Sequence, residues 1–254
     1  MKDAYVKYSV ENKIGTIDFF TPQQNSLPGK TLSDLASAIE QAGKDKNSKV
    51  LILKSSASKT FCAGAFLDEL IMIENEEQGF RFFNRFATVI NAMRRCPKFI
   101  IGRIHGKAIG GGVGLAGSCD YSFGTIRSEI KLSELSIGIG PFVVGPAIER
   151  KIGAAAAYEL TIDATNFRSA EWAKEKGLFA GIFDTEELMD ESIDKLANTL
   201  AASSPEAMAE IKKSFWHGTE HWNELLQERA AISGRLVFSD HTRKFIQQFK
   251  NNKK

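Results

Sequence analysis

Hydrophobic and polar residues recur with two different periods along the first three quarters of the chain. Strands are expected where residues alternate with a period of two or form a short apolar run, at 5–10, 14–19, 50–53, 99–104 and 121–124. Helices are expected where apolar positions recur three and four residues apart, or where a turn leads into small residues, at 28–42, 68–73, 79–95 and 112–118. Because strands and helices alternate, the pattern predicts an α/β core.

The last part of the chain has a different character. From residue 146 onward the pattern is mostly helical, and Ser204-Pro205 is typical of a helix start, since serine caps a helix and proline suits its first position. A length of 254 residues fits one large domain, or one domain with a helical appendage. We therefore expect a core at residues 1–195 and a C-terminal helical region at 196–254, both within one functional unit.

Composition excludes several classes of protein. Lys and Arg number 33 against 31 Asp and Glu, and a net charge of +2 disfavours a dedicated nucleic-acid or membrane-surface binder. No run approaches the roughly 20 apolar residues that a membrane span needs, and no signal-peptide core opens the chain. Cysteines without a CxxC motif and histidines without an HExxH motif disfavour disulfide and metal sites. We expect a cytoplasmic protein without a bound metal.

Two segments rich in small residues stand where helices are expected to begin, at 61–67 and 105–114. The first N–H groups of a helix lack intrahelical partners and lie at the positive end of its dipole. Two such groups that converge form an oxyanion hole, worth about 3 kcal/mol per donor to a developing enolate. The other interpretation, that the glycines only allow tight turns and packing, has equal weight for either segment alone.

The GxGxxG pattern at 112–117 raises the question of a dinucleotide site. In such a site the preceding strand runs almost directly into the first glycine. Here residues 105–111 intervene, so the spacing disfavours a nicotinamide or flavin cofactor.

Three motifs, taken in their order along the chain, point to a known family. They are Phe61-Cys62-Ala63-Gly64-Ala65, the segment from Gly106 through Gly110-Gly111-Gly112 to Cys119-Asp120, and Ser133-Glu134 with Ile137-Gly138 and Pro141. With this order and spacing, the chain resembles the enoyl-CoA hydratase/isomerase (crotonase) family over nearly its whole length. The resemblance implies a crotonase-like spiral of ββα turns and a C-terminal helical trimerisation region. It also implies a homotrimer or a dimer of trimers, and an acyl-CoA substrate, with coenzyme A present only as part of that substrate and no other cofactor.

The resemblance also assigns roles to residues. The backbone N–H groups of Ala65 and Gly111 would form the oxyanion hole, and Glu134 would be the acid/base. The substrate-binding positions would be Ala63, Phe66, Leu67, Gly110, Gly114 and Phe142. Hydratases of the family usually carry two glutamates, and the position of the first is Gly114 here, so chemistry must run through Glu134 alone. Flanking apolar residues favour a raised pKa for Glu134, whereas a surface carboxylate at a strand edge is the alternative.

Residues 110–115 and 132–144 resemble a narrower branch, which includes methylglutaconyl-CoA hydratases and the related dehydratases that build β-branches on polyketides. This resemblance implies addition or loss of water across C2–C3 of a branched, carboxylated acyl-CoA. An enclosed distal carboxylate should meet a cation, and the sequence leaves four candidates open: Arg81, Arg85, Arg103 and Lys107.

Other activities stay open at this stage. An oxyanion hole serves any enolate, so a crotonase-fold isomerase or decarboxylase is the nearest alternative, although Glu134 favours proton transfer. A non-catalytic member, acting in assembly or RNA binding, is a further alternative because the first glutamate is missing. The near-neutral charge disfavours RNA, whose affinity comes largely from phosphate neutralisation.

Overall fold

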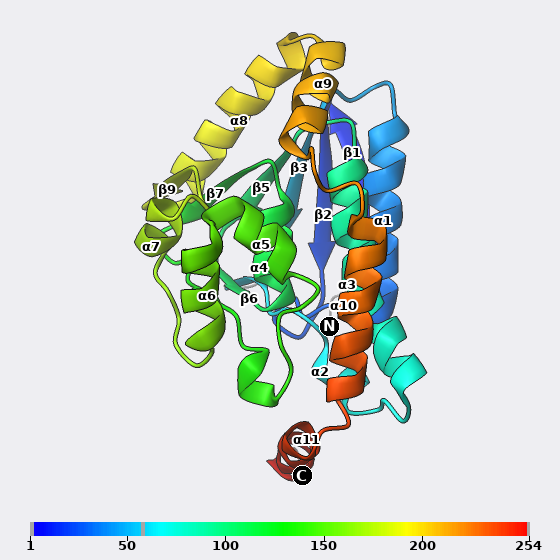
Figure 1. Ribbon diagram of the computed structural model, residues 1–254. Helices are drawn as coiled ribbons and strands as arrows, with labels where there is room; N and C mark the ends of the chain where they lie inside the picture. Colours follow the sequence, from blue (N-terminus) through cyan, green and yellow to red (C-terminus); the bar gives the residue numbers. More distant parts are fainter. Residues whose placement is uncertain (1–2, 57–58, 253–254) are drawn as a thin grey trace.

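A six-stranded sheet and a three-stranded sheet organise this computed structural model, which describes residues 3–56 and 59–252 (Figure 1). The large sheet has the order β1-β2-β3-β5-β7-β9. Its strands are β1 (Tyr5–Glu11), β2 (Ile14–Phe20), β3 (Val50–Ser55), β5 (Ile100–Ile104), β7 (Tyr121–Thr125) and β9 (Gly181–Phe183). β1 and β2 form an antiparallel hairpin, and every other neighbouring pair is parallel. The predicted α/β class is confirmed.

Helices cover both faces of the large sheet because its central strands are apolar on both sides. Leu51 and Leu53 of β3 belong to the main core, together with apolar residues of α1 (Gly29–Lys44) and α3 (Glu76–Arg95). The alternate residues, Val50 and Ile52, pack against α8 (Glu186–Ala202) on the opposite face. The period-two side-chain alternation of a strand thus fixes which helix lies on which face.

The small sheet positions the functional segments. Its strands are β4 (Thr60–Cys62), β6 (Lys107–Ile109) and β8 (Ile130–Lys131), in the order β4-β6-β8 and all parallel. Parallel strands place their carboxyl ends along one edge of a sheet. The segments that follow β4, β6 and β8 therefore converge there, although they are far apart in the sequence.

The remaining helices include a C-terminal group that packs back on the core. They are α2 (Leu67–Leu70), α4 (Gly111–Ser118), η1 (a 3₁₀ turn, Leu135–Ile137), α5 (Gly145–Ile152), α6 (Ala154–Ile162), α7 (Ala170–Glu175), α9 (Pro205–Phe215), α10 (Trp222–Leu236) and α11 (Asp240–Asn252). α10 lies beside α3 (Figure 1), and its Trp222, Leu226 and Ala230 belong to the main core. The domain boundary expected after residue 195 falls inside α8, and α10 of the expected C-terminal region contributes to the main core.

A buried ion pair also fastens α9 to this core. The Asp120 carboxylate lies 2.7 Å from Lys212 Nζ, and the two side chains are 5% and 2% exposed. The same carboxylate accepts hydrogen bonds from the Ile100 backbone N–H and from Trp216 Nε1, at 2.8 and 3.2 Å. Trp216 and Trp222 then pack edge to face within the chain.

The observed elements differ from the sequence expectations in ways that have local causes. α3 begins at Glu76 rather than residue 79 because the Asn75 side chain accepts a hydrogen bond from the Gln78 N–H and caps the helix. β9 was missed, since three residues are too few to display a period of two. None of the helices among the described residues is both long enough and apolar enough to span a membrane.

Candidate active site

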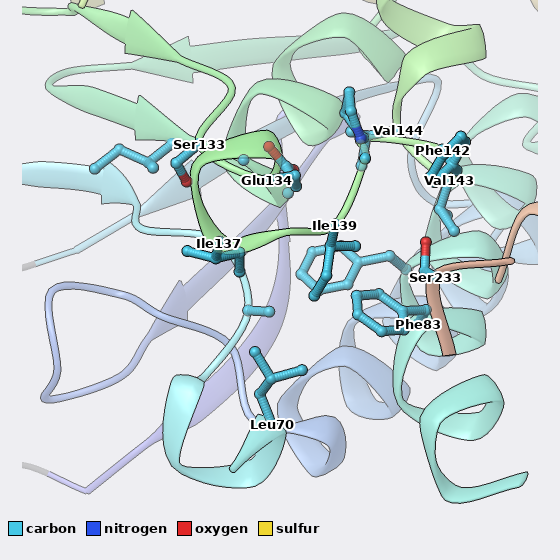
Figure 2. A pocket seen from close by; sticks show the side chains of 18 of the residues that line it. Leu70, Phe83, Ser133, Glu134, Ile137, Ile139, Phe142, Val143, Val144 and Ser233 are labelled. Atoms are coloured by element: carbon cyan, nitrogen blue, oxygen red, sulfur yellow. The ribbon is translucent and has the colours of Figure 1, made fainter. Parts of the chain in front are cut away.

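A cavity of about 200 Å³ opens at the carboxyl edge of the small sheet (Figure 2). Ala63 and Ala65 follow β4, Gly110 and Gly111 follow β6, and Glu134 follows β8, and all of them line the cavity. The remaining wall is largely apolar and comes from α2, α3 and the loop after η1, including Leu70, Phe82, Phe83, Phe86, Ile139 and Val143. A largely apolar wall lowers the local dielectric, so hydrogen bonds and charges inside act more strongly than in water.

The Ala65 N–H is left free by the pairing of its neighbours. Leu27 donates its N–H to the Gly64 carbonyl at 2.7 Å, and the Phe66 N–H donates to the Leu27 carbonyl at 3.2 Å. This isolated bridge leaves the Ala65 N–H without a backbone acceptor among the described residues. The N–H is therefore available to a ligand oxygen in the cavity.

The second free donor is the Gly111 N–H. Gly111 is the first residue of α4, so its N–H has no intrahelical acceptor. Gly64, at φ +80°, lies against it, and a Cβ built on Gly64 would be only 3.1 Å from Gly111 N. The chain segment of Ala65 and the start of α4 are thus in contact, which places both free donors at one end of the cavity.

Glu134 brings a carboxylate to the same end. A Cβ built on Gly110 would lie 3.0 Å from Glu134 Oε1, so the carboxylate packs directly against the Cα of Gly110. Gly110 immediately precedes Gly111, whose N–H is the second free donor. Among the described residues, the buried Oε2 atom has no hydrogen-bond partner. Burial raises the pKa of Glu134 from its ordinary value of 4.5 to about 7. Near neutral pH the group therefore exists in both forms and suits proton transfer.

Gly114 does not line the cavity, and no glutamate fits at its position without rearrangement. A Cβ built on Gly114 would lie 2.5 Å from Val144 Cγ1 and 2.7 Å from Val144 Cβ. Val144 itself lines the cavity, so an apolar side chain stands in front of this position. Within the part of the chain that the structure describes, Glu134 is the only carboxylate in the cavity wall.

Most of the residues expected to form the site do meet in the cavity wall. Those that line it are Ala63, Ala65, Leu67, Gly110, Gly111, Glu134 and Phe142. Phe66 lies instead in a shallower hollow outside, between α2 and α3. Phe142 and Val143 both line the cavity, and Val143 also contributes to the main core.

The candidate cations for a distal carboxylate are placed elsewhere. None of the four lines the cavity, and each pairs with an acidic side chain: Arg81 with Glu77, Arg85 with Glu69, Lys107 with Glu129, and Arg103 with both Glu186 and Asp190. Over the described residues, the cavity wall contains no lysine or arginine at all. The described part of the chain therefore places no cation in this wall for a carboxylate at the far end of an acyl group.

Ser233 of α10 also lines the cavity, and sequence reasoning missed it. It lies about a hundred residues beyond the motifs, in a helix whose pattern predicts packing, and no local signal marks it. Two cysteines of the motif segments, Cys62 and Cys119, lie outside the cavity wall: burial raises the pKa of their thiols to about 12, so they stay protonated and act as small apolar groups.

The family model for enoyl-CoA hydratase/isomerase matches residues 9–254. The chain belongs to this family. A Bacillus subtilis (strain 168) relative named "Probable enoyl-CoA hydratase" is 27% identical over 252 residues, which cover 98% of this chain and 96% of that protein. The mitochondrial methylglutaconyl-CoA hydratase of Rattus norvegicus is 31% identical over 201 residues, or 78% of this chain and 63% of that protein.

Solved structures of the enoyl-CoA hydratase/isomerase family have the same fold. The enoyl-CoA hydratase from Bacillus halodurans superimposes with a TM-score of 0.88 at 20% identity, covering 96% of this chain and 99% of that one. The crotonase-like fold expected from the motifs is confirmed. Family relatives are also named as an isomerase and as a decarboxylase, so membership by itself leaves the reaction open.

Proposed function

We propose that this protein adds water to, or removes it from, the C2–C3 bond of a short, branched enoyl-CoA thioester. The observation that supports this most strongly is the Glu134 carboxylate, whose Oε2 atom has no hydrogen-bond partner among the described residues, beside two free backbone donors in a largely apolar wall. The donors, Ala65 and Gly111, bind the thioester carbonyl oxygen and stabilise the enolate that forms on it. Coenzyme A enters only as part of the substrate.

In hydration, one carboxylate moves one proton twice. The Glu134 carboxylate takes a proton from a water molecule as the water oxygen bonds to C3. The C2–C3 π electrons move toward the thioester carbonyl, and the enolate oxygen accepts hydrogen bonds from Ala65 and Gly111. Protonated Glu134 then delivers the same proton to C2, which regenerates the carbonyl and the carboxylate. Dehydration is the same sequence in reverse, so each direction begins with ionised Glu134.

The proposed reaction is favoured over its nearest alternatives by the acid/base group. A decarboxylase forms its enolate by releasing carbon dioxide and needs no base for that step, so it would use Glu134 only as the acid that then protonates C2, whereas hydration uses the group as both base and acid. An isomerase needs the same proton transfer at C2 but returns the proton to a different carbon. Only the product separates isomerisation from hydration.

The acyl group we propose is branched, with 3-methylglutaconyl as the first to be tested. The relative named methylglutaconyl-CoA hydratase supports this choice. The largely apolar wall suits the branched hydrocarbon part. The absence of a cation from the described part of that wall means that a distal carboxylate must find another polar partner.

A homotrimer, or a dimer of trimers, is the assembly we propose for this chain. The helices α9, α10 and α11 follow the core in the region where the family resemblance implies trimerisation. Mass photometry at nanomolar concentration should give three or six times the mass of one chain. A monomer alone would contradict the proposed assembly.

The test is mass-resolved turnover of 3-methylglutaconyl-CoA beside crotonyl-CoA, with purified protein and no added cofactor. We expect the branched thioester to gain one water, and to do so faster than crotonyl-CoA. Release of carbon dioxide, or a shifted double bond without a change in mass, would contradict the hydratase assignment in favour of a decarboxylase or an isomerase. Binding of both thioesters without reaction would favour a non-catalytic role.

A further inference from the structure

The Ser233 side chain is a polar group in an otherwise apolar part of the cavity wall. Ser233 is 1% exposed and lies on α10, whereas Glu134 follows β8. Figure 2 shows the two residues on opposite sides of the cavity, with Ile139 between them. The neighbours of Ser233 in this wall include Phe83 and Val143, so its hydroxyl lies among hydrocarbon.

The Ser233 hydroxyl differs from other serine hydroxyls in the helices of this chain. Ser33 and Ser118 each donate to the carbonyl four residues earlier, at 3.0 and 2.7 Å. This is the usual way in which a helical serine satisfies its hydroxyl. Among the described residues, the Ser233 hydroxyl makes neither that bond nor any other side-chain hydrogen bond. Its oxygen is not sealed off from the cavity, and a hydroxyl that borders a cavity without a protein partner is open to a ligand oxygen.

Close contact between two helices brings Ser233 to the cavity. Gly234 lies against α3, where a Cβ built on it would be 2.5 Å from Phe80 N, and a Cβ on Gly79 would be 2.8 Å from Gly234 Cα. The backbones of α3 and α10 therefore touch at this point. Because α3 supplies Phe82, Phe83 and Phe86 to the wall, the crossing carries the adjacent Ser233 into the same wall.

From this arrangement we infer that Ser233 is a specificity-determining residue, whose hydroxyl binds an oxygen atom at the far end of the acyl group. The inference deepens the proposed function and rests on it for the identification of this cavity as the acyl site. The substrate class is then an acyl-CoA with a distal oxygen, either an ionised carboxylate or a neutral hydroxyl. A plain branched hydrocarbon leaves Ser233 unsatisfied and binds more weakly.

Calorimetry with saturated thioesters tests the inference without turnover. The probes share one branched skeleton: 3-methylpentanoyl-CoA has no distal oxygen, 3-methylglutaryl-CoA has a carboxylate, and 5-hydroxy-3-methylpentanoyl-CoA has a hydroxyl. We expect the wild type to bind at least one oxygenated thioester about 2- to 10-fold more tightly than 3-methylpentanoyl-CoA, as one hydrogen bond allows. Ser233→Ala should abolish this preference and change the Kd of 3-methylpentanoyl-CoA by less than about twofold.

Controls separate specificity from folding. Ser33→Ala removes a helical hydroxyl that already has its partner and lies outside the cavity wall, and it should keep the preference. Equal weakening of all three thioesters by Ser233→Ala, or tightest binding of 3-methylpentanoyl-CoA by the wild type, would overturn the inference. If the preference is found but no unsaturated thioester is hydrated, the proposed function fails while the role of Ser233 stands. The two oxygenated probes tell a carboxylate from a hydroxyl.

Discussion

Two buried carboxylates of this chain have opposite surroundings. Asp120 meets a lysine, a backbone N–H and an indole N–H, so each of its oxygens has a partner. Glu134 leaves Oε2 without a hydrogen-bond partner among the described residues, and burial raises its pKa to about 7. A satisfied carboxylate fastens one helix to a core, whereas an unsatisfied one is available to a substrate. The surroundings, rather than the residue type, separate a structural carboxylate from a catalytic one.

Glu134→Gln should have the largest effect on catalysis. The amide keeps the shape of the side chain but cannot shuttle a proton, so we expect turnover to fall by about 10²- to 10⁴-fold. Binding of a saturated CoA thioester should stay nearly unchanged. Steady-state kinetics measures the turnover, and calorimetry on the same preparation measures the binding of the saturated thioester. Turnover within a few-fold of the wild type would remove Glu134 from the mechanism.

The same substitution should not reduce stability. The raised pKa means that ionised Glu134 destabilises the fold once the pH exceeds its ordinary value of 4.5, and this effect is complete above about 7. Below 4.5 the group is protonated in both states and the effect is absent. At pH 8, Glu134→Gln should therefore raise the free energy of unfolding by about 1 to 3 kcal/mol, and it should make little difference at pH 4. Denaturant unfolding at both pH values checks the sign.

Asp120→Asn is the matched substitution at the structural carboxylate, and the opposite result is expected. It leaves the Lys212 ammonium buried without its counter-ion, which should lower the free energy of unfolding by about 3 to 5 kcal/mol. The protein that remains folded should retain the kcat of the wild type. Adding Lys212→Met should recover part of the lost stability, because it removes the unpaired charge. A stability equal to that of the wild type in Asp120→Asn would erase the contrast between the two carboxylates.

The pH dependence of the rate sharpens the assignment of Glu134. Because the mechanism begins with the carboxylate in either direction, activity should fall about tenfold for each pH unit below the pKa. With a pKa of about 7, this decline should begin near neutral pH. A rate measured from pH 5.5 to 8.5 in a constant-ionic-strength buffer is sufficient. A flat profile over that interval would contradict the assignment of the raised pKa to the catalytic group.

Gly114→Ala probes the position at which the family resemblance implies the first of two glutamates. Its Cβ would meet Val144 at 2.5 Å, and such overpacking typically lowers the free energy of unfolding by about 1 to 3 kcal/mol. Val144→Gly should relieve the clash, because it removes both Cγ1 and the Cβ atom at 2.7 Å, so the double variant should be more stable than the sum of the single effects predicts. Additive effects in the denaturant midpoints would show that Val144 does not fill this space.

The parts that the sequence predicted well are those encoded locally. The loops at 61–67 and 105–114 and the position of Glu134 depend on small residues and motif spacing, and the structure brings these segments together at one edge of the small sheet. The strands of that sheet were beyond pattern reasoning. β4 and β6 have three residues each and β8 has two, too few to show a period.

The polar lining of the acyl pocket could not be predicted, for a physical reason. Arginine and lysine side chains are long, so which acid they reach depends on the fold; Arg103 turns to α8 rather than to the cavity. Ser233 enters the wall only because two glycines let α3 and α10 touch. Neither effect leaves a trace in the periodicity of the chain.

The central claim, that Glu134 moves a proton at C2 beside the Ala65 and Gly111 donors, can be tested without knowing the natural substrate. Isovaleryl-CoA incubated in D₂O with the wild type should exchange its C2 protons for deuterium. Mass spectrometry measures the gain in mass of the thioester. We predict that Glu134→Gln slows this exchange at least about 100-fold while it still binds the thioester. Exchange at the wild-type rate in Glu134→Gln would contradict the account.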